Sequence, residues 1–124
     1  MSLLCNAFPS MNSICVNTGE VKISKKILMT GFVKTCSVIG FSYKNNNFLA
    51  HIDAMKPNMK NQVINEINKL NPKYINKIHI WKGSNCNSNC PSFAIAKQIT
   101  NKLKGNVIIH QANNNIIKIT TNLK

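Results

Sequence analysis

The sequence predicts an α+β domain in which a mixed β-sheet or β-sandwich layer carries two amphipathic helices on one face. Several short segments rich in β-branched residues precede two segments whose apolar residues recur at helical spacing. Apolar residues make up 44% of the 124 residues, as in ordinary globular proteins. This length fits one domain. We therefore predict a loose arm at residues 1–12 and a single domain at residues 13–124.

The first half of the chain has the pattern of extended segments. Turn signals at Asn17-Thr18-Gly19 and at Asn45-Asn46-Asn47 separate neighbouring segments, because Asn and Gly tolerate left-handed backbone angles. The predicted strands cover residues 13–16, 20–24, 26–32, 36–43 and 48–53. We expect the last two to pair with each other across the asparagine turn.

The second half alternates between helix and strand. Proline at position 57 suits a first helical turn and Pro72 stops the helix, whose face carries Met59, Val63 and Ile67. A second helix begins at Pro91 and ends before Gly105. A strand is predicted at residues 74–81, and strands at 106–111 and 115–121 are expected to close the chain as a hairpin.

The charge balance is strongly basic, with 16 cationic residues, three acidic ones and a formal net charge of +13. Such a surplus suits a nucleic acid or an acidic protein surface. The chain has no arginine, its lysines are scattered, and Lys, Asn and Ile dominate together, so a biased base composition explains the charge better. A basic binding module stays an alternative. No apolar run approaches the about 20 residues that span a bilayer, so no membrane partner is expected.

The acidic residues are too few for carboxylate chemistry. Glu20, Asp53 and Glu66 are the only carboxylates, which argues against paired-carboxylate catalysis and against a carboxylate metal cage. Thiol, imidazole and hydroxyl groups remain as candidates.

Five cysteines without a secretory signal argue against a disulfide framework and favour a cytoplasmic protein. Cys86 and Cys90 could form half of a zinc site completed by His79 or His110. The preferred interpretation is two free thiols in a polar loop. No metal and no cofactor are expected.

Cys36 and His51 are the residues best suited to catalysis. Thr35 and Cys36 open one predicted strand, and His51 and Asp53 close the next. An imidazole beside a thiol can stabilise the nucleophilic thiolate and carry its proton. Asp53 shares a strand face with His51 and could fix its tautomer, or could simply cap the following helix. Thr30 offers a hydroxyl as a further partner of the ring.

Spacing alone also fits simpler interpretations. A strand cysteine is most often a small buried apolar residue, and a strand histidine is most often structural. If Tyr43 pairs with Phe48, His51 lies opposite Gly40 and about 13 Å along the strands from Cys36. Contact would then need a bulge, strong twist or another register.

The stretch from Leu28 to Phe41, followed by Leu49-Ala50-His51, resembles the catalytic segment of the CheD chemoreceptor glutamine deamidases. In that family a Thr, a Cys and a His follow in this order at similar spacing. The Thr-Cys and His-x-Asp pairs are also similar to those of protein N-terminal asparagine amidohydrolases. The deamidase domain of cytotoxic necrotizing factor toxins uses a comparable Cys and His.

The resemblance implies that Cys36 attacks a side-chain carboxamide of glutamine or asparagine and forms a thioester. His51 would protonate the departing ammonia and then activate water, and Thr30 would orient His51. Thr35 and Asp53 would support the site, and backbone N–H groups near Cys36 would stabilise the oxyanion. The expected partner is a protein or peptide bearing the amide. Cys36 is expected to have a low apparent pKa.

Overall fold

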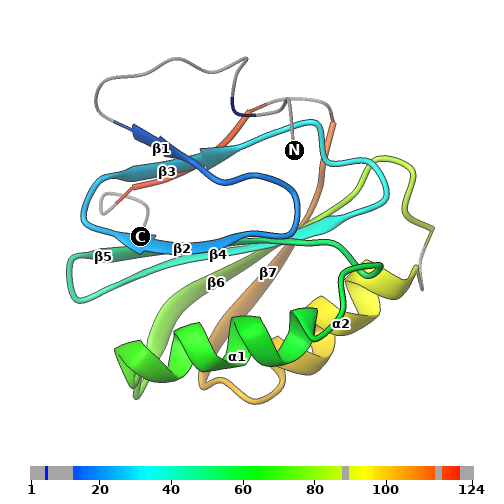
Figure 1. Cartoon of the computed structure of the whole chain (residues 1–124). Helices are drawn as coiled ribbons and strands as arrows, with labels where there is room; N and C mark the ends of the chain where they lie inside the picture. Colours follow the sequence, from blue (N-terminus) through cyan, green and yellow to red (C-terminus); the bar gives the residue numbers. More distant parts are fainter. Residues whose placement is uncertain (1–4, 6–12, 88–89, 114–115, 121–124) are drawn as a thin grey trace.

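The computed structural model describes residue 5 and residues 13–87, 90–113 and 116–120. The protein is an α+β structure, as predicted, and its elements form three layers (Figure 1). The helices cover one face of a five-stranded sheet, and a three-stranded sheet covers the other face. None of the described helices combines the length and apolar character needed to cross a membrane. The predicted arm at residues 1–12 lies outside the described residues, apart from Cys5.

The central sheet has the strand order β2-β5-β4-β6-β7, and only its β6–β7 pair is parallel. Its strands are β2 (Val21–Ser24), β4 (Ser37–Tyr43), β5 (Asn46–Ile52), β6 (Ile75–Lys82) and β7 (Gly105–Gln111). The smaller sheet has the order β1-β3-β8, with β1 parallel to β3 and β8 antiparallel to it. Its strands are β1 (Ser13–Cys15), β3 (Ile27–Thr30) and β8 (Ile117–Ile119).

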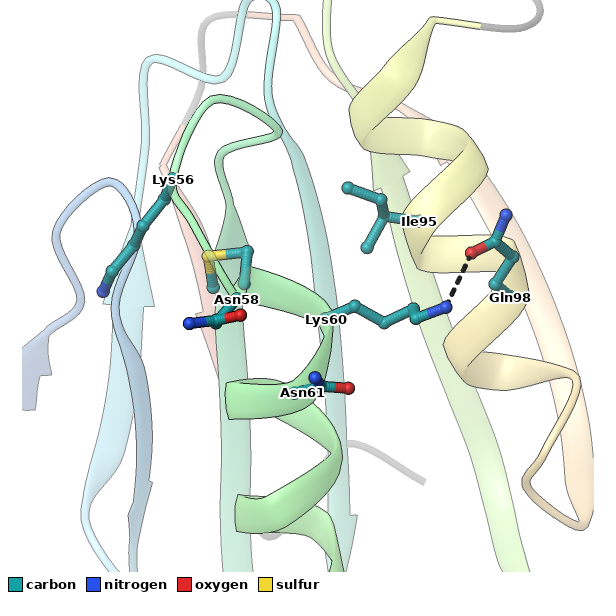
Figure 2. A pocket seen from close by; sticks show the side chains of 7 residues that line it. Lys56, Asn58, Lys60, Asn61, Ile95 and Gln98 are labelled. Carbon is teal, nitrogen blue, oxygen red and sulfur yellow. Dashed lines mark hydrogen bonds between the residues drawn. The ribbon is translucent and has the colours of Figure 1, made fainter.

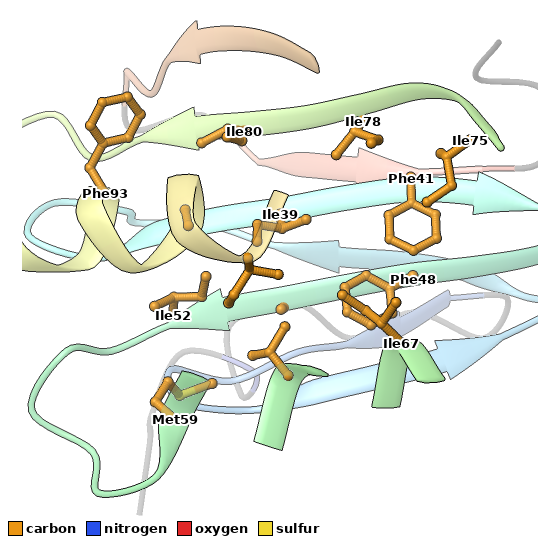
Figure 3. Close-up of a cluster of buried hydrophobic side chains, with 14 of the residues drawn as sticks. Ile39, Phe41, Phe48, Ile52, Met59, Ile67, Ile75, Ile78, Ile80 and Phe93 are labelled. Atoms are coloured by element: carbon orange, nitrogen blue, oxygen red, sulfur yellow. The ribbon is translucent and has the colours of Figure 1, made fainter. Parts of the chain in front are cut away.

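Two amphipathic helices form the third layer. Helix α1 (Met59–Leu70) buries Met59, Val63 and Ile67 at the predicted spacing, and Asn71 ends it in a left-handed conformation. It begins two residues after Pro57, so this proline belongs to the preceding turn. Helix α2 (Pro91–Thr100) begins at the predicted proline. Figure 3 shows the apolar core between these helices and the central sheet.

A second apolar cluster fills the space between the two sheets. It includes Leu28 of β3, Val38 of β4, Leu49 of β5 and Ile119 of β8. Gly40 permits the close approach of the sheets, because an added Cβ would lie 2.5 Å from the Ile119 side chain. Strand alternation explains why neighbouring residues of β4 and β5 enter different cores.

The β4–β5 hairpin confirms the predicted pairing but not the predicted register. Its turn consists of Lys44 and Asn45, both with positive φ, so Tyr43 pairs with Asn46. Two-residue turns of this kind match the natural twist of a hairpin. As a result His51 lies opposite Val38 rather than Gly40, two residues closer to Cys36 than predicted.

The predicted hairpin at the end of the chain is wrong. Strand β7 pairs with β6 at the edge of the central sheet, whereas β8 pairs with β3 in the smaller sheet. Ile117 and Ile119 are both buried, so β8 gains more by closing the inter-sheet core than by extending the central sheet. Gly105 opens β7 instead of acting as a helix stop.

Candidate active site

Cys36 lies at the end of a tightly held loop between β3 and β4. Three backbone carbonyls of this loop accept hydrogen bonds: Val33 from the Ser84 N–H at 2.9 Å, Lys34 from the Asn85 N–H at 3.0 Å, and Thr35 from the Ser92 hydroxyl at 2.8 Å. The Cys36 side chain is half-buried and packs against the inter-sheet cluster. The loop therefore presents the thiol towards the space between the sheets.

Gly83 allows β6 to run directly beside this loop. A Cβ at this position would overlap the carbonyl oxygens of Lys34 and Cys36. Neither Gly83 nor Ser92 was predicted to belong to the site. Ser92 follows the helix-opening Pro91, so the pattern indicated only a helix start. A glycine two residues after the strand predicted at residues 74–81 is the one signal that could have indicated a close backbone approach.

His51 is buried near the end of β5 and has a defined tautomer. Its Nδ1 lies 2.7 Å from the Thr30 hydroxyl, which in turn donates its proton to the Val16 carbonyl at 2.7 Å. Because a hydroxyl has a single proton, Thr30 must accept from the ring. The imidazole therefore carries its proton on Nδ1, and Nε2 keeps a free lone pair.

The backbone of His51 is equally fixed. Its carbonyl accepts the Gly19 N–H at 2.8 Å, and its N–H donates to the Glu20 carbonyl at 3.0 Å. The hydroxyl of Thr30 comes from the small sheet and the ring from the central one, so their bond joins the two sheets. The ring is thus held from both sides of the inter-sheet space.

Cys36 and His51 lie on the same side of the central sheet. His51 pairs with Val38, and Cys36 precedes Val38 by two residues on the same chain segment. Such diagonal neighbours are about 7–8 Å apart, which is much closer than the predicted register implied. No hydrogen bond joins the Cys36 sulfur to His51 in the described residues. Proton transfer between the two side chains would require a closer approach of the Cys36 sulfur to the His51 ring.

Burial keeps both groups neutral. It raises the pKa of the Cys36 thiol to about 11, and the nearby negative charge of Asp53 adds to this increase. Burial lowers the pKa of His51 to about 4, although Asp53 partly opposes the change. The expected low pKa of Cys36 is therefore wrong. At neutral pH the pair is a thiol and an uncharged imidazole rather than a thiolate and an imidazolium.

Asp53 and Thr35 occupy places different from those predicted. The Asp53 carboxylate accepts the Met55 N–H at 2.9 Å and so shapes the turn after β5, well before the start of α1. Thr30, rather than Asp53, bonds the His51 ring. Thr35 is exposed, and its contribution to the loop is its backbone carbonyl.

The cysteines contradict the predicted free thiols. Disulfides join Cys5 to Cys15 and Cys86 to Cys90, and Cys36 is the free cysteine. The second disulfide removes both thiols of the hypothetical zinc half-site. The described residues contain no group of three or more His, Cys, Asp or Glu side chains that could hold a metal ion.

The two histidines considered for zinc contact each other instead. Nδ1 of His79 lies 2.9 Å from Nε2 of His110, and both rings stack with Trp81. Burial lowers the pKa of both histidines, and in His79 the His110 and Lys77 charges add to this effect. Trp81 and His110 continue a row of paired residues across the central sheet. In this row His51 pairs with Val38, Val38 with Trp81, and Trp81 with His110.

A groove of about 290 Å³ lies elsewhere, between the start of α1 and the middle of α2 (Figure 2). The Lys60 ammonium donates to the Gln98 side-chain oxygen across it at 3.3 Å. This groove is on the helix side of the central sheet, whereas His51 and Cys36 face the smaller sheet. Among the described residues, no cysteine, histidine, serine or threonine lines this groove.

Comparison with known proteins adds no assignment. No protein-family model matches the chain, and no curated protein matches it.

Proposed function

We propose that this protein is a cysteine-dependent amidohydrolase that deamidates a glutamine or asparagine side chain of a protein or peptide. The observation that carries the proposal is the His51 ring, whose Nδ1–H donates to Thr30 and whose Nε2 is therefore unprotonated. This ring lies on the same side of the sheet as the free cysteine, Cys36. The order of Thr30, Cys36 and His51, which resembles that of the CheD deamidases, supports it further.

In the proposed reaction Cys36 acts as a neutral nucleophile. As its sulfur attacks the carboxamide carbon, the thiol proton moves to Nε2 of His51, and the amide oxygen becomes an oxyanion. This resembles the activation of a serine by histidine, since the thiol does not need to be ionised beforehand. His51 then gives the proton to the leaving nitrogen, the carbon–nitrogen bond breaks, and ammonia departs from a thioester.

Water completes the cycle. His51 takes a proton from water, the resulting hydroxide attacks the thioester carbon, and the carbon–sulfur bond breaks. The proton held by His51 returns to the sulfur, so the free thiol is restored and the product is a carboxylic acid that ionises at neutral pH. No cofactor takes part in the proposed steps.

The cytoplasmic location remains a prediction. The two disulfides argue against it, because disulfides are more typical of an oxidising compartment. The net charge of +13 would favour substrates with an acidic surface.

The proposal is tested by incubating a whole-cell protein extract with the purified protein in heavy-oxygen water under non-reducing conditions. Peptide mapping is expected to find Gln-to-Glu or Asn-to-Asp sites that carry the heavy oxygen. Because the nucleophile is Cys36, these sites should be lost with Cys36→Ala and with the closely matched Cys36→Ser.

If the extract proteins still acquire labelled sites with both Cys36 variants, the deamidation does not depend on Cys36, and this result would contradict the proposal. An extract without labelled sites, together with salt-dependent binding of DNA or RNA that Cys36→Ala leaves unchanged, would favour the basic binding module.

A further inference from the structure

Ser92, the second residue of α2, reaches from the helix layer to both neighbours of Cys36. It is fully buried, and its hydroxyl lies 2.8 Å from the Thr35 carbonyl oxygen and 3.0 Å from the Ser37 hydroxyl. A buried serine at this position therefore bonds the chain on either side of the candidate nucleophile.

The direction of these hydrogen bonds follows from counting protons. Ser92 donates its single hydroxyl proton to Thr35, so it accepts the proton of Ser37. The result is a directed chain from Ser37 through Ser92 to the Thr35 carbonyl. All three groups are satisfied, as buried polar groups require.

The Thr35 carbonyl belongs to the same peptide unit as the Cys36 N–H. A trans peptide is planar, and its N–H points opposite to its carbonyl, so fixing one fixes the other. Within the described part of the chain the Cys36 N–H has no hydrogen-bond acceptor. The carbonyl of Gly83, which directly follows β6, accepts hydrogen bonds from the Cys86 N–H and the Gln111 side chain.

We infer that Ser92 is a positioning residue that aims the Cys36 N–H at the oxyanion formed during attack by the thiol. The inference rests on the proposed function and adds to it the group that holds the oxyanion donor in place. A donor fixed before the reaction stabilises the developing charge without reorganisation. Cys90, whose sulfur lies 3.5 Å from the Ser92 hydroxyl, is bonded to Cys86 and helps to fix the start of α2.

Two small reagents separate positioning from a general structural role. Attack of Cys36 on p-nitrophenyl acetate passes through an oxyanion, whereas its alkylation by iodoacetamide does not. For Ser92→Ala we expect acetylation of Cys36 to slow about 30-fold, somewhat less than when an oxyanion donor is removed altogether. Alkylation should stay within about twofold of wild type, since the thiol itself is unchanged. Mass spectrometry locates both modifications at Cys36.

Ser92→Thr keeps the hydroxyl and is expected to restore most of the acetylation rate. Ser37→Ala removes only the outer link of the chain and should slow acetylation about threefold without affecting alkylation. It also tests the inference if Ser92→Ala fails to fold, which circular dichroism would reveal.

Equal losses in both reactions would overturn the inference, because they would assign Ser92 a structural role only. Unchanged acetylation in folded Ser92→Ala would overturn it as well. A wild-type protein whose Cys36 is alkylated but never acetylated would instead contradict the proposed function, so the two failures can be distinguished.

Discussion

Replacing Thr30 with valine is expected to slow acetylation of Cys36 by p-nitrophenyl acetate about 100-fold, which corresponds to about 2.7 kcal/mol of activation free energy. Valine preserves the shape of the side chain but removes the oxygen that accepts the His51 Nδ1–H at 2.7 Å. Without this acceptor the ring can place its proton on Nε2, where it blocks transfer from the thiol. The rate is measured by stopped-flow absorbance of released p-nitrophenolate.

Thr30→Ser is the matched control, because it keeps the hydroxyl and should acetylate at nearly the wild-type rate. Thr30→Val also removes the donor to the Val16 carbonyl, so its free energy of unfolding should fall by about 1–3 kcal/mol. Acetylation of folded Thr30→Val at the wild-type rate would mean that the Thr30 contact does not control the His51 tautomer.

Replacing Gly83 with alanine is expected to affect stability and reactivity together. The added methyl group would overlap the carbonyl oxygens of Lys34 and Cys36, which are backbone atoms and cannot rotate away. We expect the free energy of unfolding to fall by about 1–3 kcal/mol. The loop that carries Cys36 must shift to relieve the overlap, and a displacement near 1 Å can slow a reaction about 100-fold. Urea unfolding and acetylation of Cys36 measure the two effects.

Ser84→Ala is the control for this change. Ser84 is exposed, and its contribution to the loop is the backbone N–H bonded to Val33, which alanine retains. Its stability and acetylation rate should match wild type. If Gly83→Ala also matched wild type in both measurements, close packing of β6 against the Cys36 loop would not matter for the site.

Side-chain periodicity accounts for what could be predicted. Helix α1 shows its apolar face at every third or fourth residue, and the alternation in β4 and β5 assigns each residue to one face of the sheet. Alternation determines only whether a register is odd or even. Pairing Tyr43 with Asn46 or with Phe48 places each side chain on the same face of the sheet, because the two registers differ by two residues. The register therefore depends on which of several adjacent asparagines form the turn.

Local sequence patterns could not predict contacts between segments that are distant along the chain. Strand β8 pairs with β3 rather than with the central sheet, and Cys5 is bonded to Cys15 at a sequence separation of 10. The odd number of cysteines also led to the wrong expectation for the disulfides. Burial of Cys36 and His51, which determines their pKa values, depends on the smaller sheet and so required the structure.

The claim that His51 is the base for Cys36 is tested most directly by the pH dependence of Cys36 acetylation. With a His51 pKa of about 4, the neutral ring is available throughout the range above it, so wild-type acetylation should be nearly independent of pH between about pH 5 and 9. His51→Gln leaves only the thiolate route. Because the Cys36 pKa is about 11, its rate should rise about tenfold per pH unit across that range. A wild-type rate that rises as steeply as that of His51→Gln would contradict the account.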